Sequence, residues 1–384
     1  MRGSVVKRGK GYSVVLDLGD DPQTNKRRQK WHSGFRTKRE AQAALAEMIG
    51  SVNQGTYVTR TKQSLAAFTD EWLAAIAPTV RPATHYSYAR NLRLHVLPYI
   101  GTVPMVAIDA GTLNGLYARL LAEGRKDFEG GGLSPRSVRY VHTILHRVFK
   151  DAVKWGRLVR NPSDAADPPR SVASGAPETT TWTADELRRF LDGVADDRVY
   201  AAYLLLATSG MRRGEALGLR WADLDLDGGR ASIRQTVIVV SHVVQMGTPK
   251  TAKGRRTVTL DAVTVSGLRE HRVRQNAERL LMGSGWSDLD LVFCRVDGTP
   301  LHPERFTRQF SERVRQLGLP KLRLYDLRHG WATMALTAGV HPKVVQERLG
   351  HANIGITLDT YSHVTAGLHS DAADKVAGLV FGPR

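Results

Sequence analysis

The chain has 384 residues and a formal net charge of +18 at pH 7, from 55 Lys and Arg against 37 Asp and Glu. This length predicts two or three domains, and an excess of positive charge of this size indicates a polyanionic partner. The sequence has no run of about 18 apolar residues and no signal-peptide pattern at its start, so we expect neither a membrane span nor export. The single cysteine, Cys294, cannot form an internal disulfide, and we expect a small core residue in a reducing compartment.

The positive charge is concentrated at the beginning of the chain. The net charge is +8 over residues 1–63, +5 over 64–170 and +5 over 171–384. Charge alone is compatible with nucleic acid, with anionic lipid or with good solubility, and we favour nucleic acid. The order of motifs along the chain has to decide between them.

Residues 3–35 predict a small three-stranded antiparallel sheet, because short apolar stretches alternate with turn residues. A helix follows, opened by a capping box from Thr37 to Glu40. We expect the helix to cover one face of the sheet and the other face to bind DNA, although a solvated basic surface is the alternative. The cationic and aromatic residues expected on that free face are Lys7, Arg8, Lys10, Tyr12, Lys26, Arg27, Arg28, Lys30 and Trp31.

Residues 64–160 predict a basic helical bundle. Apolar residues keep a helical period up to Pro78, and Arg81-Pro82 and Ser134-Pro135 begin later helices. Arg136 and Arg139 lie off the apolar stripe of the last helix, where we expect them to contact DNA. His142 and His146, one turn apart with no third ligand evident, are expected at the bundle surface or near DNA phosphates, not at a metal.

Residues 161–181 are rich in Pro, Ser, Ala and Gly and predict a linker. The segment 182–384 predicts an α+β domain, in which a capping box from Thr183 to Glu186 opens the first helix. Strands are expected at 231–240, 243–247 and 256–260, and mainly helices from residue 263 onward. The predicted fold class is therefore α+β and multidomain.

This last segment contains five short motifs, each of which is weak alone. They are Thr208-Ser-Gly-Met-Arg212-Arg-Gly-Glu215, Pro249-Lys250-Thr251, Tyr325-Asp-Leu-Arg328-His329, Leu349-Gly350-His351 and Thr357-Leu-Asp-Thr-Tyr361-Ser-His363. In this order and spacing they resemble the tyrosine recombinase family, the phage-integrase type of site-specific recombinase. The resemblance implies an arm-site DNA-binding domain at 1–63, a core-site DNA-binding domain at 64–160, a linker at 161–181 and a catalytic domain at 182–384.

The same resemblance implies a role for each motif. Arg212 and Arg328 would clamp the scissile phosphate, a natural task for planar guanidinium groups, and His351 would hydrogen-bond to it. Tyr361 would be the nucleophile that forms a covalent 3′-phosphotyrosine, and Lys250 the general acid for the leaving 5′ oxygen.

Glu215 and Tyr325 are two further positions within these motifs. Glu215, one turn beyond Arg212, would orient that arginine. Tyr325 stands where the family often has a histidine, and a phenol with an unperturbed pKa of ~10 is a poor base. Tyr325 therefore either hydrogen-bonds to the phosphate or only packs against or orients Arg328. His329 and His363 would be phosphate-facing or neighbouring groups, with a surface position as the alternative.

The implied function is a DNA-cutting and rejoining enzyme that integrates and excises a prophage or integrative element, without a metal or cofactor. Its expected partners are double-stranded DNA with core-type and arm-type attachment sites, three further copies of the chain, and possible excisionase and host DNA-bending proteins. It would act in the cytoplasm at the nucleoid, with the tail 362–384 docked on a neighbouring copy or on its own domain. The alternatives are a type IB topoisomerase, which the arm-like N-terminus disfavours, and a catalytically silent DNA-binding regulator.

Overall fold

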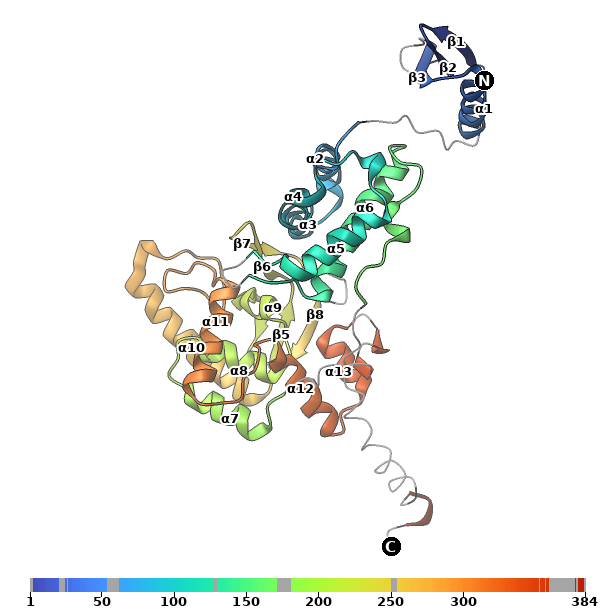
Figure 1. Ribbon diagram of the computed structural model, residues 1–384. Helices are drawn as coiled ribbons and strands as arrows, with labels where there is room; N and C mark the ends of the chain where they lie inside the picture. The colour runs from blue at the N-terminus through green and yellow to red at the C-terminus, as the bar shows by residue number, and fades with distance from the viewer. Residues whose placement is uncertain are drawn as a thin grey trace. The chain divides into compact units, whose positions relative to one another are not determined.

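The computed structural model describes most of the chain and divides it into two compact units, Met1–Val172 and Ala173–Arg384 (Figure 1). The described residues are 3–20, 25, 27–53, 62–126, 130–170, 181–249, 254–351, 353–355, 357–358, 377 and 379–382. Lys26, Lys250, Tyr361 and His363 lie outside them, as does most of the tail. The proposed division into arm, core, linker and catalytic segments stays a prediction.

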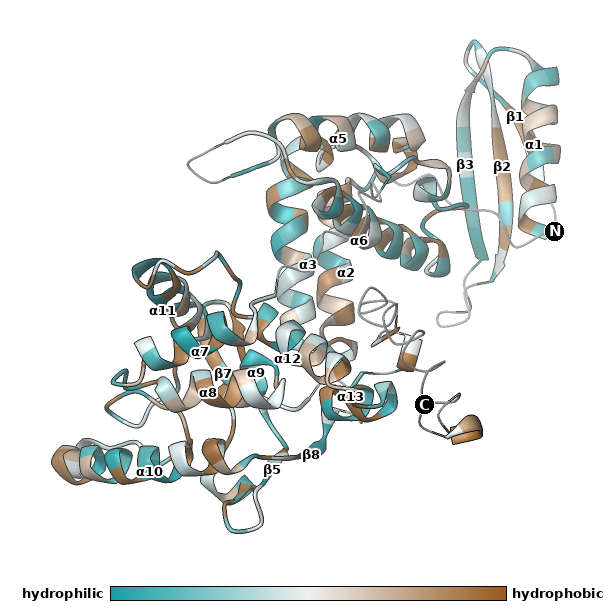
Figure 2. Cartoon of the chain, turned by 90° about the horizontal axis from the view of Figure 1, so that it is seen from below, coloured by the Kyte–Doolittle hydropathy of each residue, from teal (hydrophilic) through white to brown (hydrophobic). Residues whose placement is uncertain are grey.

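The N-terminal segment forms the predicted sheet and helix. Strands β1 (Gly3–Arg8), β2 (Gly11–Asp20) and β3 (Arg27–Phe35) pair antiparallel in that order, and α1 (Lys38–Asn53) follows. The capping box is present, since the amide of Glu40 donates to Thr37 Oγ1 at 3.2 Å and the amide of Thr37 to Glu40 Oε2 at 3.3 Å. The middle strand supplies the buried residues Val14, Val15 and Leu16 and is more apolar than β3 (Figure 2).

The strand register distributes the predicted cations over both faces of this sheet. Lys30 pairs with Leu16, which pairs with Gly3, and a Cβ added at Gly3 would meet Leu45 of α1. Lys30 therefore lies on the face that α1 covers, because paired residues share a face. Arg8 and Trp31 lie on the opposite face, with the guanidinium 5.8 Å from the ring centroid. The expectation that all these cations share one free face is wrong, because neighbours such as Lys7 and Arg8 must point to opposite sides.

The next segment is the predicted helical bundle. Its helices are α2 (Leu65–Ile76), α3 (Pro82–His95), α4 (Leu97–Ile100), α5 (Ala110–Glu123) and α6 (Pro135–Lys154). Ser64, Asp109 and Ser134 cap α2, α5 and α6 with their side chains, which fixes where these helices begin. One apolar core joins the helices, with Trp72 and Phe149 among its fully buried side chains.

One of the two bundle histidines, His142, differs from the expectation. His142 Nδ1 lies 2.8 Å from the hydroxyl oxygen of Tyr117, a buried residue of α5, so this imidazole is a partner inside the bundle. His146 Nε2 lies 3.0 Å from Asp164 Oδ1 and remains at the surface. The apolar periodicity of α6 alone could not reveal this pairing, because the hydroxyl comes from another helix, α5.

The second unit combines two small sheets with a helical core. Its helices are α7 (Ala184–Gly193), α8 (Tyr200–Ser209), α9 (Arg213–Leu217), α10 (Ala262–Met282), α11 (Pro303–Gln316), α12 (Asp326–Thr337) and α13 (Pro342–Leu349). Its strands are β4 (Leu224–Asp225), β5 (Arg230–Ile233), β6 (Thr236–Val240), β7 (Val243–Gly247) and β8 (Arg256–Thr259), ordered β4-β5-β8 and β6-β7. Cys294 is buried, as expected. Over the described ranges, none of the helices combines the length and apolar character that crossing a bilayer requires.

The predicted strand 231–240 is two strands in two different sheets. β5 pairs with β8, whereas β6 forms a hairpin with β7, and the break lies at Arg234 and Gln235. Gln235 donates from Nε2 to the carbonyl oxygen of Gly218, and Arg234 Nε lies 3.4 Å from Asp223 Oδ1. Both contacts come from the α9 to β4 connection, so a tertiary contact ends a strand that the apolar pattern continues.

Candidate active site

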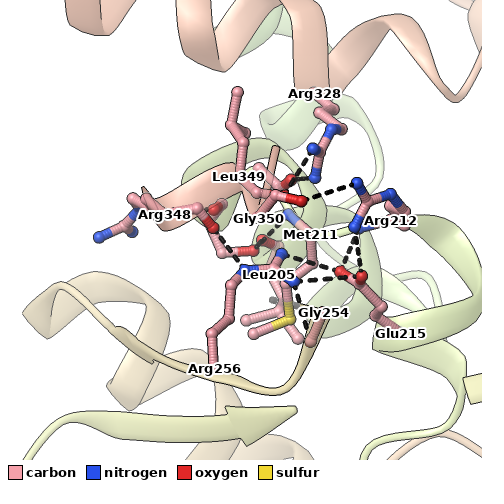
Figure 3. Close-up of polar contacts among 12 residues, drawn as sticks. Leu205, Met211, Arg212, Glu215, Gly254, Arg256, Arg328, Arg348, Leu349 and Gly350 are labelled. Atoms are coloured by element: carbon pink, nitrogen blue, oxygen red, sulfur yellow. Dashed lines mark hydrogen bonds and ion pairs between the residues drawn. The ribbon is translucent and has the colours of Figure 1, made fainter. Parts of the chain in front are cut away.

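Arg212 is positioned by the short helix α9, which it precedes. Its Nη1 donates to Glu215 Oε1 at 2.7 Å, and its backbone amide donates to Glu215 Oε2 at 3.0 Å. Glu215 is 4% exposed, whereas the side chain of Arg212 is 38% exposed. The carboxylate thus binds both the backbone amide and Nη1 of Arg212 (Figure 3). The exposed part of the guanidinium remains open to a ligand.

Gly210 lies in the turn between α8 and α9, which packs closely against α12 and α13. Its φ of 68° is left-handed, a conformation that strains any other residue type. A Cβ at this position would also lie 2.8 Å from Leu349 and 3.0 Å from Trp331. The glycine in the first motif therefore permits both the end of α8 and a close approach of two distant helices.

Arg328 lies in the first turn of α12 and is 2% exposed. Its Nη1 donates to the carbonyl oxygen of Gly210 at 2.8 Å, and its Nη2 to that of Leu349 at 2.7 Å. These two bonds tie α12 to the end of α8 and to the end of α13. Burial, followed by the charge of Arg212, lowers the pKa of Arg328 to about 10, so it stays charged at neutral pH.

His351 directly follows the end of α13, where Gly350 has a left-handed φ of 67°. Its Nδ1 lies 2.8 Å from Thr357 Oγ1, and its backbone carbonyl accepts a bond from Gln346 Nε2 at 2.9 Å. Burial, then the charges of Arg328 and Arg212, lower its pKa to about 4. His351 is therefore a neutral imidazole next to two guanidinium groups, and it can donate one hydrogen bond.

Arg212, Arg328 and His351 thus converge on one place, although 139 positions separate the first from the last. They meet at the end of α13, whose final carbonyl groups accept from Arg328 at 2.7 Å and from Arg212 at 3.4 Å (Figure 3). Two guanidinium groups and a neutral imidazole form a site suited to a phosphate group with delocalised negative charge.

Tyr325 occupies the position before Asp326 at the start of α12 and is 50% exposed. Its ring packs edge-on against His329, with centroids 5.1 Å apart. Burial, opposed by Asp326 and aided by Arg328, lowers the pKa of His329. Both sequence alternatives for Tyr325 stay open, because its ring packs on a neighbour while half of the residue is accessible.

Sequence reasoning gave no role to two arginines of this site. Arg256 Nη2 lies 2.9 Å from Glu215 Oε2, and Arg348 Nη2 donates to the carbonyl oxygen of Thr208 at 3.2 Å. The alternation of residues along β8 indicated that Arg256 faces inward, because it lies two residues before the buried Val258 and therefore on the same face of the strand. Lys250 and Tyr361 cannot be placed in this geometry, since they lie outside the described residues.

The cations predicted to bind DNA lie at the surface of the first unit. The exposed ones among the described residues are Lys7, Arg8, Lys10, Arg27, Arg28, Lys30, Arg136 and Arg139. Two of them have partners within the chain: Arg27 Nε donates to Asp17 Oδ2 at 2.9 Å, and Arg139 Nη1 donates to the carbonyl oxygen of Pro169 at 3.1 Å. Their contact with DNA stays a prediction.

Three family models match successive parts of this chain. Residues 181–367 match the phage integrase family, residues 4–52 match an arm DNA-binding domain, and residues 64–121 match the N-terminal SAM-like domain of phage integrases. The chain therefore belongs to the phage integrase family of tyrosine recombinases and is an enzyme of that family, as the motifs predicted.

Relatives of known name agree with this assignment. A XerC-like tyrosine recombinase of Caldanaerobacter subterraneus is 26% identical over 97% of this chain and 98% of its own length. An integrase of Mycobacterium phage D29 is 26% identical over 81% of this chain and 78% of its own length. The fold is similar to that of the Tn1549 transposon integrase, solved with a circular intermediate DNA, with a TM-score of 0.68, 20% identity, and coverage of 82% of this chain and 100% of that one.

Proposed function

We propose that this chain is a site-specific recombinase that cuts and rejoins double-stranded DNA to integrate and excise a prophage or an integrative element. The observation that supports this most is the convergence of Arg212, Arg328 and His351 at the end of α13. These groups match the demand of phosphoryl transfer without a metal, in which negative charge grows on the non-bridging oxygens of the transition state.

The arginines supply the electrostatic part of the proposed reaction. Arg328 already donates from Nη1 and Nη2 to backbone carbonyls, so its contribution to a phosphate comes from its fixed charge and its three remaining N–H groups. Arg212 is more open, and its guanidinium is available for direct hydrogen bonds. His351, neutral at pH 7, donates the third hydrogen bond.

Tyr361 and Lys250 complete the proposed chemistry. The Tyr361 hydroxyl gives its proton to water as its oxygen attacks the phosphorus atom, the bond from phosphorus to the 5′ oxygen breaks, and Lys250 gives that oxygen its proton. The 3′-phosphotyrosine keeps the energy of the broken bond, so the reverse attack by a 5′ hydroxyl reseals DNA without ATP. Tyr325, beside Arg328, hydrogen-bonds to the phosphate or packs next to it.

The first unit would supply the DNA-binding surfaces. In this proposal the sheet face with Arg8 and Trp31 binds arm-type sites, and the bundle surface with Arg136 and Arg139 binds core-type sites. Four copies exchange strands at the nucleoid in the cytoplasm, each tail 362–384 docking on a neighbour, and an excisionase and a host bending protein set the direction.

The test of this function is covalent capture on a nicked duplex taken from the DNA that flanks the gene. The nick lets the short 5′ strand diffuse away after cleavage, so the protein remains attached to the 3′ phosphate. We expect a denaturant-resistant adduct with the wild-type chain and none with Tyr361→Phe, which should still bind the duplex. An adduct that persists in Tyr361→Phe would show that another residue is the nucleophile.

Two outcomes would favour the alternative functions. Absence of any adduct with bound wild-type protein would favour a silent DNA-binding regulator. Relaxation of a supercoiled plasmid that lacks the flanking sequence, as fast as recombination of one that carries it, would favour a type IB topoisomerase.

A further inference from the structure

Arg256 is an almost fully buried arginine at the centre of the site, although no motif assigned it a role. It is the first residue of β8, and its side chain is 8% exposed. Nη1 and Nη2 donate to the two carboxylate oxygens of Glu215 at 3.2 and 2.9 Å, and Nε donates to the carbonyl oxygen of Arg348 at 2.6 Å (Figure 3). With so little exposed surface, this guanidinium is turned to the protein rather than to DNA.

Three arginines from three different elements share the end of α13. The carbonyl groups of residues 348, 349 and 350 accept, in that order, from Arg256 at 2.6 Å, Arg328 at 2.7 Å and Arg212 at 3.4 Å. The last carbonyls of a helix have no partner within it and carry partial negative charge, which favours cationic donors. His351 follows these three residues directly, so its position depends on the same contacts.

Glu215 connects the same arginines from the other side. Its carboxylate accepts from Arg212 and from Arg256, and the charge of Arg328 also acts on it. Burial alone would raise the pKa of Glu215, but the hydrogen bonds and charge of Arg256, followed by the charge of Arg212, keep it below the usual value. Without Arg256, a carboxylate that is 4% exposed would have to be balanced largely by the arginine that is needed for substrate.

We propose that Arg256 is a positioning residue for the recombination reaction. It keeps Glu215 charged and in place, so that Glu215 can accept from the backbone amide and Nη1 of Arg212. It also binds the end of α13, which His351 directly follows. This inference rests on the proposed function and adds to it a residue that acts through Arg212 and His351 without touching DNA.

The experiment compares two methionine variants that remove the same kind of contact. Arg256→Met is the test, and Arg198→Met is the matched control. Arg198 likewise donates to a carboxylate, Glu278, at 2.7 and 2.6 Å and to a backbone carbonyl, that of Cys294, at 2.6 Å. The control therefore shows how far the loss of a partly buried ion pair in the same unit, away from the site, lowers stability and rate.

The first measurement is the single-turnover rate of adduct formation on the flanking-DNA duplex, at saturating protein and with binding measured separately. We expect Arg256→Met to be about 100-fold slower with duplex affinity within about twofold, because misplacement of catalytic groups by ~1 Å has effects of this size. Arg256→Lys should recover part of the rate by restoring the charge, and Arg198→Met should stay near wild type. A rate for Arg256→Met equal to that of Arg198→Met would overturn the proposal.

The second measurement is Tm against pH, which needs no reaction. In Arg256→Met the pKa of Glu215 should rise above its unfolded value, so the variant is destabilised most at pH 8 and regains stability as the carboxyl takes up a proton toward pH 5. The Tm difference from wild type should therefore shrink on acidification. A difference that does not change with pH would contradict the role of Arg256 in balancing Glu215, even if the wild-type chain formed no adduct.

Discussion

Two groups of arginines in this chain lie in opposite environments. The side chain of Arg256 is 8% exposed and Arg328 is 2% exposed, and each donates to groups fixed on other elements. Arg8 and Arg28 of the N-terminal sheet are exposed. The buried arginines act through position, because hydrogen bonds to fixed acceptors hold each guanidinium in place. The exposed ones act through charge, which many arrangements could supply.

This contrast explains why the net charge indicated a polyanionic partner but did not indicate which residues form the active site. The N-terminal segment contributes +8 of the total of +18, mostly from exposed side chains that suit phosphate backbones. In the second unit, four arginines of the site are held by one carboxylate and by backbone carbonyls. Exchanging Arg for Lys should therefore have very different effects in the two regions.

The largest effect is expected from Arg328→Lys. A lysine keeps the charge but cannot donate to the carbonyls of Gly210 and Leu349 at once, so the ends of α8 and α13 lose their connection. We expect adduct formation to slow by about 10²–10³-fold, the size of effect seen when one electrostatic donor is removed from an active site. The matched change Arg8→Lys should leave the rate unchanged, and equal losses in both variants would remove the contrast.

Deletion of residues 1–63 should separate the two regions. The truncated chain should form the covalent adduct on the flanking-DNA duplex at close to the wild-type rate, while losing affinity for a distal repeat. The full chain's affinity should fall steeply between 50 and 200 mM salt, by roughly tenfold or more if several phosphates are contacted. An unchanged footprint on the distal repeat after deletion would refute the arm-site assignment.

The pH dependence of stability should reveal the charged surroundings of His351. Its pKa is about 4 in the folded chain against an ordinary 6.5, so the unfolded chain takes up this proton first as the pH falls. Stability is therefore unaffected by this group above pH 7 and is lost progressively between about pH 6.5 and 4. His351→Gln should reduce the acid-side fall in Tm, and an identical Tm profile would contradict the low pKa.

The smallest effect is expected at the exposed pair of Arg27 and Asp17. These side chains hydrogen-bond within the sheet, and Arg27, then the amide of Gly19, lowers the pKa of Asp17. Exposed ion pairs contribute little to stability, because water screens them. Arg27→Gln should leave Tm within error of wild type at pH 7, whereas a clear drop would indicate that this surface pair behaves like the buried ones.

Much of the local structure followed from the sequence because short-range rules decide it. The capping residues Thr37, Ser134 and Thr183 predicted where three helices begin, and the structure confirms all three. The apolar stripe of α6 was confirmed as well, since a period of 3.6 residues places its members on one face. The motif order gave the family, which the comparisons confirm.

The failures share one physical cause, which is a partner distant in sequence. The strand predicted at 231–240 breaks where Gln235 bonds to Gly218, and His142, which is partly buried, hydrogen-bonds to Tyr117 of α5. The cations of the N-terminal sheet divide between two faces because the strand register, and not their clustering, decides where each side chain points.

The sequence by itself determined the family, the local elements and the residue types suited to a phosphate, because spacing and composition carry that information. Only the tertiary structure decided which arginines share a carboxylate, and it brought Arg256 to Glu215 and to the end of α13. An arginine on an exposed surface and an arginine in a buried network cannot be distinguished by residue type in the sequence. Burial and fixed partners, which depend on the whole fold, give them different physical tasks.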